Sequence, residues 1–398
     1  MQSNLSIYKT GYGPSSSHTM APAKATKAFR QKTKSASGYI VELFGSLAAT
    51  GKGHMTDVAI VKELELDNIK VIWSPEEFLD FHPNAMKLTS LGKDGKPKKS
   101  EIAYSVGGGE IVWDKDKNKR RGPKKRYPHR NMKQILAHLA KSRYTFWEYV
   151  YLLEGEAFSS HLEQVWHQMK LTIESGLIKE GVLPGGLNIQ RKACTYKIKA
   201  NGYTGSMKRQ CLTFAYALAT AEQNASGGTV VTAPTCGSAG VVPAVLYQLL
   251  QSYAFDEKRI INALATAALV GGLIRANASI SGAEVGCQGE IGAACSMAAA
   301  VACQLFGGSP PQIEYAASIA LEHFLGLTCD PICGLVQVPC IERNALAAAR
   351  AMSCNAYATL SDGNHFVSFD KVVSVLKKTG HDLPSIYKET SLGGLAVE

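Results

Sequence analysis

Residues 291–306, IGAACSMAAAVACQLF, form the longest apolar run in the sequence and determine how its second half is interpreted. The run is rich in alanine and includes Gln304, and it is shorter than the roughly 20 strongly apolar residues that a membrane-spanning helix needs. A helix that is apolar on all sides is typically buried inside a folded domain. The run therefore predicts a core helix and not a membrane span.

Alanine-rich segments of the same kind recur along the chain after about residue 165. They carry small residues at helical spacing, and glycine- and serine-rich breaks that are typical of loops separate them. The helices predicted from them cover residues 212–222, 239–252, 258–274, 291–306, 310–324 and 344–353. We therefore expect an all-helical domain over residues 165–398.

The first 150 residues follow a different pattern, in which short β-like runs alternate with helical ones. Residues 39–43 (YIVEL) and 69–73 (IKVIW) have the β-branched and aromatic content of strands, and residues 102–106 lead through a glycine turn into a further strand. Helices are predicted at 21–34 and 57–65. The expected fold class is α+β, with an N-terminal, α/β-sandwich-like β domain over residues 1–150 followed by the all-helical domain.

Composition places the chain among soluble globular proteins, because 45% of its residues are hydrophobic and 19% are charged. Its first residues, MQSNLSIYKTGYG, lack the apolar segment of a signal peptide, so a cytoplasmic location is expected. The formal net charge of +10 comes largely from residues 93–99 and 115–130. Such runs are typical of lysine-rich surface loops. Binding of nucleic-acid phosphates by residues 115–130 is the alternative, although no known DNA- or RNA-binding pattern accompanies them.

Ten cysteines raise the question of metal or catalytic use, because a cytoplasmic protein rarely has a disulfide framework. Cys287, Cys329 and Cys340 differ from the others because glycine, proline or threonine flanks each of them, which predicts turns between helices. Their separations of 42 and 11 residues match neither the paired cysteines of a zinc site nor the close spacing of a ferredoxin. By spacing alone, packing in the core is favoured and a three-thiolate cluster is the alternative.

Residues 13–25, GPSSSHTMAPAKA, place five hydrogen-bonding side chains directly before a predicted helix. These are Ser15, Ser16, Ser17, His18 and Thr19. A helix N-terminus needs only one such cap. The free N–H groups and the dipole of a helix N-terminus attract negative charge. The stretch therefore predicts a seat for an anion.

Seven blocks of the sequence resemble the iron–sulfur-dependent L-serine dehydratases, also called L-serine ammonia-lyases. In order, they are GPSSSHTMAPAKA, FGSLAATGKGHMTD, YSVGGGEIV, ASGGTVVTAPTCGSAGVVPAV, NASISGAEVGCQGEIGAACSMAAA, LGLTCDPICGLVQVPCIERNA and KETSLGGLA. They extend from about residue 11 to about residue 395, with little contribution from about 115–200. The resemblance implies a single chain in which the β and α domains of this family are fused, and it implies a homodimer.

The resemblance further implies that the chain deaminates L-serine to pyruvate and ammonia on a 4Fe–4S cluster. The positions that match the family's cluster ligands are Cys287, Cys329 and Cys340, and the iron without a thiolate would act as a Lewis acid on the substrate hydroxyl. The cysteines after residue 287 that do not match cluster ligands are expected to pack among the helices. They are Cys295, Cys303, Cys333 and Cys354. Cys333 is also near enough in sequence to two ligands to take part.

The substrate-binding turns also follow from the resemblance. The carboxylate of L-serine would sit on Ser15, Ser16, Ser17 and Thr19, and the turn APTCGSAG (233–240) would complete the pocket through Thr235, Gly237 and Ser238. Candidate catalytic residues are His18, Lys52, His54 and His82. Neutral histidines suit proton abstraction near neutral pH, and the choice among the three is open. Many family members have asparagine where this chain has Cys236, so the role of Cys236 is open as well.

Three other functions are compatible with parts of the sequence. A pyridoxal-phosphate dehydratase would need a Schiff-base lysine and a glycine-rich phosphate cradle, and no lysine of this chain has such a context. A cluster-dependent cysteine desulfidase is related, but the SSSHT and TGKGH blocks favour serine as the substrate. The third function is nucleic-acid binding by residues 115–130.

Many members of the family continue beyond the GGLA block into a short tail with a cysteine, whereas this sequence ends at GGLAVE. A tail cysteine would compete with the substrate for the open iron at high effective concentration. The resemblance therefore implies that the fourth iron carries only water, hydroxide or another small ligand.

Overall fold

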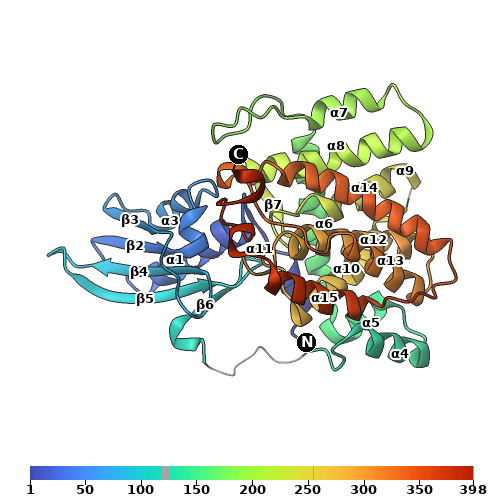
Figure 1. The fold of residues 1–398 in the computed structure, drawn as a ribbon, viewed down its shortest axis with the longest axis horizontal. Helices are drawn as coiled ribbons and strands as arrows, with labels where there is room; N and C mark the ends of the chain where they lie inside the picture. The colour runs from blue at the N-terminus through green and yellow to red at the C-terminus, as the bar shows by residue number, and fades with distance from the viewer. Residues whose placement is uncertain (119–125, 254, 398) are drawn as a thin grey trace.

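The computed structural model describes residues 1–118, 126–253 and 255–397. A β-sheet with its own helices forms one end of the molecule, and a larger helical part forms the other (Figure 1). This arrangement confirms the predicted α+β class. The basic run at 115–130 lies partly outside the described residues; within them, Lys115 pairs with Glu101 and Lys117 with Asp114.

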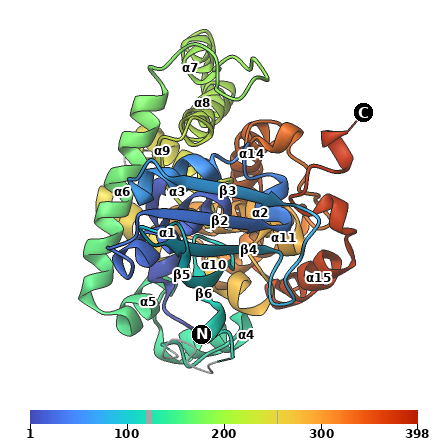
Figure 2. The same ribbon diagram turned by 90° about the vertical axis from the view of Figure 1, so that its left-hand side faces the viewer.

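Five strands form the sheet, in the order β3-β2-β4-β5-β6. They are β2 (Gly38–Phe44), β3 (Ile69–Ser74), β4 (Asn84–Leu91), β5 (Pro97–Ser105) and β6 (Ile111–Trp113). β2 and β3 are parallel and the other neighbours are antiparallel. In Figure 2 these strands lie across the front of the molecule. The strands predicted at 39–43, 69–73 and 102–106 are confirmed, whereas β4 was not predicted.

Helices of the same domain cover one face of the sheet. They are α1 (Ala21–Gln31), α2 (Gly45–Ala49) and α3 (Thr56–Leu64). Val41 and Leu43 of β2 and Leu88 of β4 are fully buried in one core with Phe29 of α1 and Ile60 of α3. Because alternate residues of a strand point to opposite faces, this burial fixes which side of the sheet carries the helices.

The helical part is built around one central helix. Its helices are α4 (Met132–Ser142), α5 (Phe146–Glu154), α6 (Glu156–Gly176), α7 (Ala193–Ala200), α8 (Gly205–Ala225), α9 (Val241–Tyr253), α10 (Glu257–Asn277), α11 (Gly282–Val285), α12 (Ala293–Leu305), α13 (Pro310–Glu322), α14 (Cys340–Thr359) and α15 (Phe369–Asp382). α12 lies between α9, α10, α13 and α14, and its alanines are fully buried. The apolar run 291–306 is thus confirmed as a core helix, because small side chains let four neighbours approach it.

By length and composition, α10 is the one helix of the described residues that could cross a membrane. Of that apolar stretch, 72% is buried inside the protein. α10 packs against α12 and α5. This burial is what the core helix of a folded domain shows.

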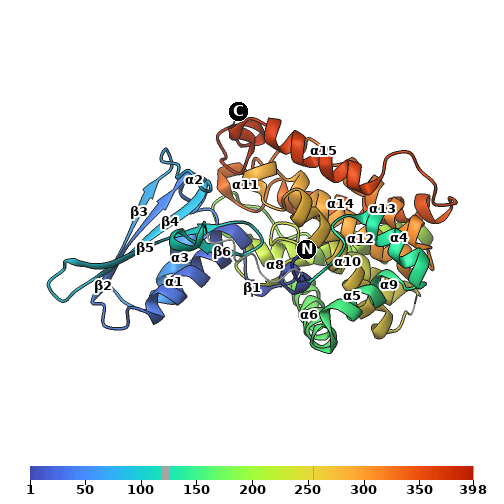
Figure 3. The ribbon, with the colours of Figure 1, turned by 90° about the horizontal axis from the view of Figure 1, so that it is seen from below.

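The start of the chain joins the helical part. Strand β1 (Thr10–Tyr12) pairs antiparallel with β7 (Thr229–Val231), so the second half is not entirely helical. Figure 3 shows β1 between the sheet and the helical part. The preceding turn η1 (Asn4–Ile7) contacts α10. Tyr127, Ile135 and Phe146 also belong to the hydrophobic core of the helical part. Segments before residue 150 therefore contribute to both cores.

A buried carboxylate fixes the N-terminal segment in place. Glu154 accepts hydrogen bonds from the N–H of Asn4 (2.6 Å) and from Ser3 Oγ (2.8 Å). Its Oε2 lies 3.4 Å from Arg126 Nε. Hydrogen bonds to a charged group contribute more to stability than those between neutral groups.

We predict that Glu154→Ala destabilises the protein by roughly 1.5–3 kcal/mol, because buried donors lose a charged acceptor. Thermal unfolding should show a lower Tm for this variant. Glu163→Ala, on the exposed side of α6, is the matched control and should change Tm little. Equal Tm values for the two variants would show that Glu154 does not anchor the N-terminal segment.

Candidate active site

A small cavity lies at the junction between the sheet and the helical part, and segments from the whole chain line it. Its lining residues are Pro14, Ser15, His54, Gly237, Cys287, Glu290, Ile291, Cys329, Pro331, Val336, Cys340 and Glu389. Ser15, His54, Gly237 and the three cysteines are among the residues singled out from the sequence. The fold therefore brings together groups that lie far apart along the chain.

The cysteines reach the cavity from loops and helix starts. Cys287 precedes the π-turn η4 (Gln288–Gly292), which leads into α12, and Cys340 is the first residue of α14. Cys329 lies in the loop after α13, where its N–H donates to Tyr387 O (2.8 Å). The sulfurs of Cys287 and Cys329 and a carboxylate oxygen of Glu290 lie within 4.8 Å of one another.

The surroundings of the thiols favour their protonated forms unless a cation joins them. A hydrogen bond with Cys287, together with burial, raises the pKa of Cys329. Burial, and then the proximity of Cys287, raises the pKa of Cys340. Burial lowers the pKa of Arg343. The negative charge of the three thiols when they are ionised, together with that of Asp330, outweighs burial and raises the pKa of Arg343 above its usual value. A bound metal group would supply positive charge here and displace the thiol protons.

Glycine at position 282 lets the backbone approach Glu290 and Cys329 closely. A Cβ at Gly282 would lie 2.9 Å from Glu290 Oε2 and 3.2 Å from Cys329 Sγ. Soft thiolate ligands are preferred by copper(I), zinc and iron–sulfur clusters. The donor set fits a cofactor that three thiolates hold.

The hydroxyl-rich turn before α1 is shaped by its own side chains. Residues Ser16–Met20 form a π-turn, η2, and Ser15 Oγ accepts from the N–H of His18 (3.0 Å). Ser17 Oγ bonds to His18 Nδ1 (2.9 Å), and Thr19 Oγ1 donates to His54 O (2.7 Å). Three of the predicted anion-binding hydroxyls thus already have partners within the turns.

Backbone groups of the same turn are open. In the described part of the chain, the N–H groups of Ser16 and Ser17 have no acceptor, and the Ser16 hydroxyl makes no hydrogen bond. The first N–H groups of a helix lack partners within the helix and carry the positive end of its dipole. The turn therefore offers an anion mainly its backbone donors.

Among the described residues, Nε2 of His54 has no hydrogen-bond partner. The hydroxyl of Thr50 donates its one proton to Ser46 O (3.1 Å). Its oxygen can therefore only accept from His54 Nδ1, which lies 3.0 Å away. Neutral His54 therefore carries its proton on Nδ1 and a lone pair on Nε2. Burial, and to a smaller extent His18, lowers the pKa of His54 well below its usual value, so that the ring is neutral near neutral pH.

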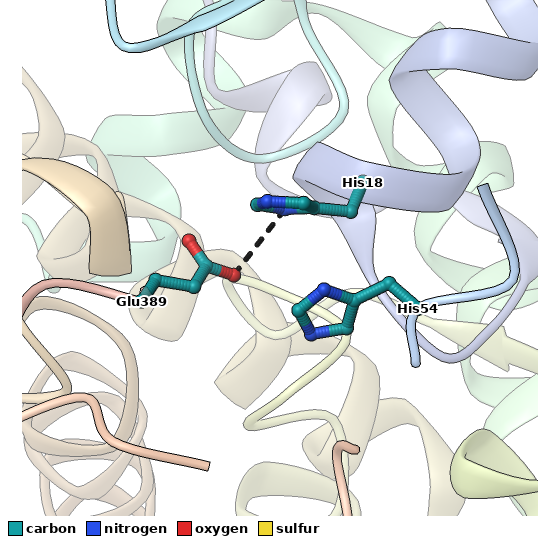
Figure 4. Close-up of side chains that lie close together, drawn as sticks. All are labelled: His18, His54 and Glu389. Carbon is teal, nitrogen blue, oxygen red and sulfur yellow. Dashed lines mark ion pairs between the residues drawn. The ribbon is translucent and has the colours of Figure 1, made fainter. Parts of the chain in front are cut away.

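His18 lies beside His54, with 4.5 Å between the ring centres (Figure 4). Its Nε2 faces Ser46 O (3.1 Å), and its Nδ1 lies 3.4 Å from Glu389 Oε1. Burial lowers the pKa of His18 to about 4 and raises the pKa of Glu389. Both shifts favour uncharged groups, so the two side chains meet as a neutral pair. Both nitrogens of His18 have protein partners.

The other two predicted catalytic residues are placed differently. His82 is buried; its Nδ1 accepts from the N–H of Asn84 (3.0 Å) and its Nε2 lies 3.3 Å from Glu284 Oε1. Lys52 is exposed, and its Nζ lies 5.9 Å from the ring centre of Trp73. The structure brings His18 and His54 together and leaves Lys52 outside the cavity.

Glu290 and Glu389 line the cavity, although the sequence analysis did not identify them. Burial raises the pKa of both carboxyl groups. Each is an acidic residue inside one of the family-like blocks that carry the cysteines or end the chain, and this is the signal that could have found them. Glu389 also links distant segments, because its N–H donates to Cys329 O (2.8 Å) and its C=O accepts from Ser46 Oγ (2.8 Å).

The turn at 233–240 contributes only Gly237 to the lining that the structure describes. Thr235 and Ser238 bond to each other through their hydroxyls (3.1 Å), and Gly237 O accepts from Asn344 Nδ2 (2.7 Å). The sulfur of Cys236 lies 3.7 Å from Met20 Sδ. Cys236 thus packs against the end of the hydroxyl-rich turn.

The remaining cysteines of this region differ in their surroundings. Cys295 and Cys303 on α12 and Cys354 on α14 are buried, as predicted. The prediction for Cys333 was wrong: it is exposed and has a φ of +54°, because it lies in a tight turn between two of the cavity cysteines. All ten cysteines are free thiols.

Known proteins match almost the entire chain. The family model described as serine dehydratase alpha chain matches residues 26–396. The L-serine dehydratase of Haemophilus influenzae is 39% identical over an alignment that covers 100% of this chain and 99% of that protein. The L-serine dehydratase 2 of Escherichia coli is also 39% identical, with the same coverage. The L-serine dehydratase of Streptomyces coelicolor is 37% identical and covers 98% of this chain and 97% of its own.

These matches extend through both the sheet and the helical part, and they include each segment that lines the cavity after residue 26. The relatives match from end to end at well above 30% identity. The chain therefore belongs to the serine dehydratase family.

Proposed function

We propose that this protein deaminates L-serine to pyruvate and ammonia by dehydration. The observation that carries the proposal is the meeting of three free thiols with His54 at one cavity. The names of the relatives support L-serine as the substrate. A direct test measures serine-dependent pyruvate formation by anaerobically prepared protein, with L-cysteine as the competing substrate.

Cys287, Cys329 and Cys340 would hold a 4Fe–4S cluster. Three thiolates leave one iron without a protein ligand, and when bound this iron would supply a Lewis acid for the departure of the β-hydroxyl. Arg343, beside the three sulfurs, would stabilise the negative charge of the thiolates. The donor set and the lack of a side chain at Gly282, beside Cys329, support this assignment.

The turn before α1 would bind the substrate carboxylate. The N–H groups of Ser16 and Ser17 and the Ser16 hydroxyl are its open donors, and the dipole of the helix favours negative charge there. The hydroxyls of Ser15, Ser17 and Thr19 would keep the turn in shape. The carboxylate would then lie beside His18, on the same turn.

His54 would remove the Cα proton of the substrate. Its Nε2 lone pair is free because Thr50 holds the ring proton on Nδ1. His18 and His82 are weaker candidates. Protein groups face both ring nitrogens of His18, and the lone pair of His82 Nδ1 already accepts from the N–H of Asn84. A cytoplasmic location and a homodimer remain predictions from the family resemblance.

We predict that Cys287→Ala, Cys329→Ala and Cys340→Ala each lose most cluster iron and serine-dependent pyruvate formation. Two thiolates should not retain the cluster. Anaerobic iron and sulfide analysis of reconstituted protein measures the loss directly. Cys303→Ala removes a buried thiol on α12 and should retain both iron and activity. Full iron content in all three single variants would refute the ligand assignment.

We predict that His54→Ala lowers kcat for L-serine about 10²- to 10⁴-fold, because it removes the general base. KM should change less, since His54 need not bind the ground-state substrate. Steady-state kinetics of His54→Ala and His82→Ala form the comparison. If turnover is lost in His82→Ala and kept in His54→Ala, the base is His82.

A pH profile tests the same assignment without a mutation. A base with a lowered pKa stays unprotonated further into acid, so kcat/KM should hold as the pH falls through the usual histidine value of about 6.5 and decline only below it. In the His54→Ala variant this acid limb should disappear or move. An acid limb centred above about 6.5 would contradict a buried, neutral His54 as the base.

A further inference from the structure

Asn84, the first residue of β4, is fully buried, yet neither atom of its side-chain amide has a hydrogen-bond partner among the described residues. Buried polar groups of folded proteins nearly always have partners, because an unpaired one is costly. An amide in this state is suited to a ligand that completes its hydrogen bonds.

Two serines near Asn84 share this property. The register of β4 and β5, which pairs Ala85 with Tyr104, places Ser105 across from Asn84 on the same face of the sheet. The loop after Ser105 packs on Ser281, because a Cβ at Gly107 would lie 3.2 Å from Ser281 Cβ. In the part of the chain that is described, the buried hydroxyls of both serines are also unpaired. Asn84, Ser105 and Ser281 are called the Asn84 group below.

The Asn84 group borders the candidate active site on two sides. Ser281 precedes Gly282, where a Cβ would lie 3.2 Å from Cys329 Sγ. Asn84 pairs with Gly45, and the next residue, Ser46, accepts from His18 Nε2 (3.1 Å). The Asn84 group is therefore connected through adjacent residues to the thiols on one side and to the turn that carries His18 on the other.

We infer that the Asn84 group binds the carboxylate of the substrate, with Asn84 Nδ2 as a donor. The amide and the two hydroxyls are uncharged groups that can all donate, and a carboxylate accepts several hydrogen bonds at once. With the open N–H groups of Ser16 and Ser17, they would surround this end of the substrate. The inference rests on the proposed function, because the carboxylate is that of L-serine.

The chain contains a matched control. Asn4 is also fully buried, and neither atom of its side-chain amide has a hydrogen-bond partner among the described residues. It lies in the helical core, where a Cβ at Gly272 of α10 would clash with Asn4 Oδ1. Asn4→Ala and Asn84→Ala remove the same atoms from the same degree of burial, but only Asn84 borders the site.

Asn84→Ala should raise KM for L-serine about 10- to 100-fold and lower kcat less, whereas Asn4→Ala should leave KM within about twofold. Asn84→Asp should raise KM further, because it places a second negative charge beside the carboxylate. Two inhibitors distinguish recognition from general damage. The inhibition constant of 3-hydroxypropanoate, which has the carboxylate, should rise in Asn84→Ala, and that of serinol, which lacks it, should not.

An unchanged KM in Asn84→Ala, or equal losses of 3-hydroxypropanoate and serinol binding, would overturn the inference. A lower Tm as the only effect would overturn it too, since it would give Asn84 a structural role. Failure of the proposed function is a different result, in which the wild-type protein forms no pyruvate from L-serine. Calorimetry with L-serine would then decide: weaker binding to Asn84→Ala supports carboxylate recognition, and equal binding refutes it.

Discussion

Three thiols and two carboxyl groups line one small cavity, and they cannot all ionise without compensating positive charge. This electrostatic constraint accounts for much of the architecture. α14 begins at Cys340, α12 follows Cys287 through η4, and α1 follows Ser15 through η2, so three helix N-termini lie near the cavity. Their dipoles favour negative charge there. The alanine-rich surfaces then let the helices pack closely as they run away from the site.

Local sequence predicted most elements, because periodicity and composition report on local burial. α1, α3, β2 and β3 follow from their apolar patterns, and α12 from its alanine content. β4 has buried residues on both faces, so it lacks the alternation that marks a half-exposed strand. The thiol ligands depended on resemblance, since their spacing matches no known motif. Glu290 and Glu389 escaped notice because tertiary contacts place them at the cavity.

The choice among the histidines illustrates what a sequence cannot contain. All three candidates are buried imidazoles in polar turns. Residue type alone therefore does not show which of them is the general base. The difference lies in hydrogen bonds: Thr50 orients one ring, whereas the carbonyl of Ser46 and the N–H of Asn84 occupy nitrogens of the other two. Those partners are set by the backbone geometry of two turns and a strand start. A tautomer is therefore a tertiary property, fixed only when the chain has folded.

The link between Ser46 and Glu389 joins residues 343 positions apart. Contacts with such large sequence separation form slowly, because the entropy of closing a long loop is lost before the contact contributes to stability. The sheet and the alanine-rich helices rely on shorter-range contacts and can form without this link. The cavity should accordingly be among the last regions to consolidate, and the three thiols would stay accessible to solvent and oxidants until then. Until this contact forms, the fold would not shield the three thiols from oxidation. Their reduced state would then depend on the reducing environment of the cell.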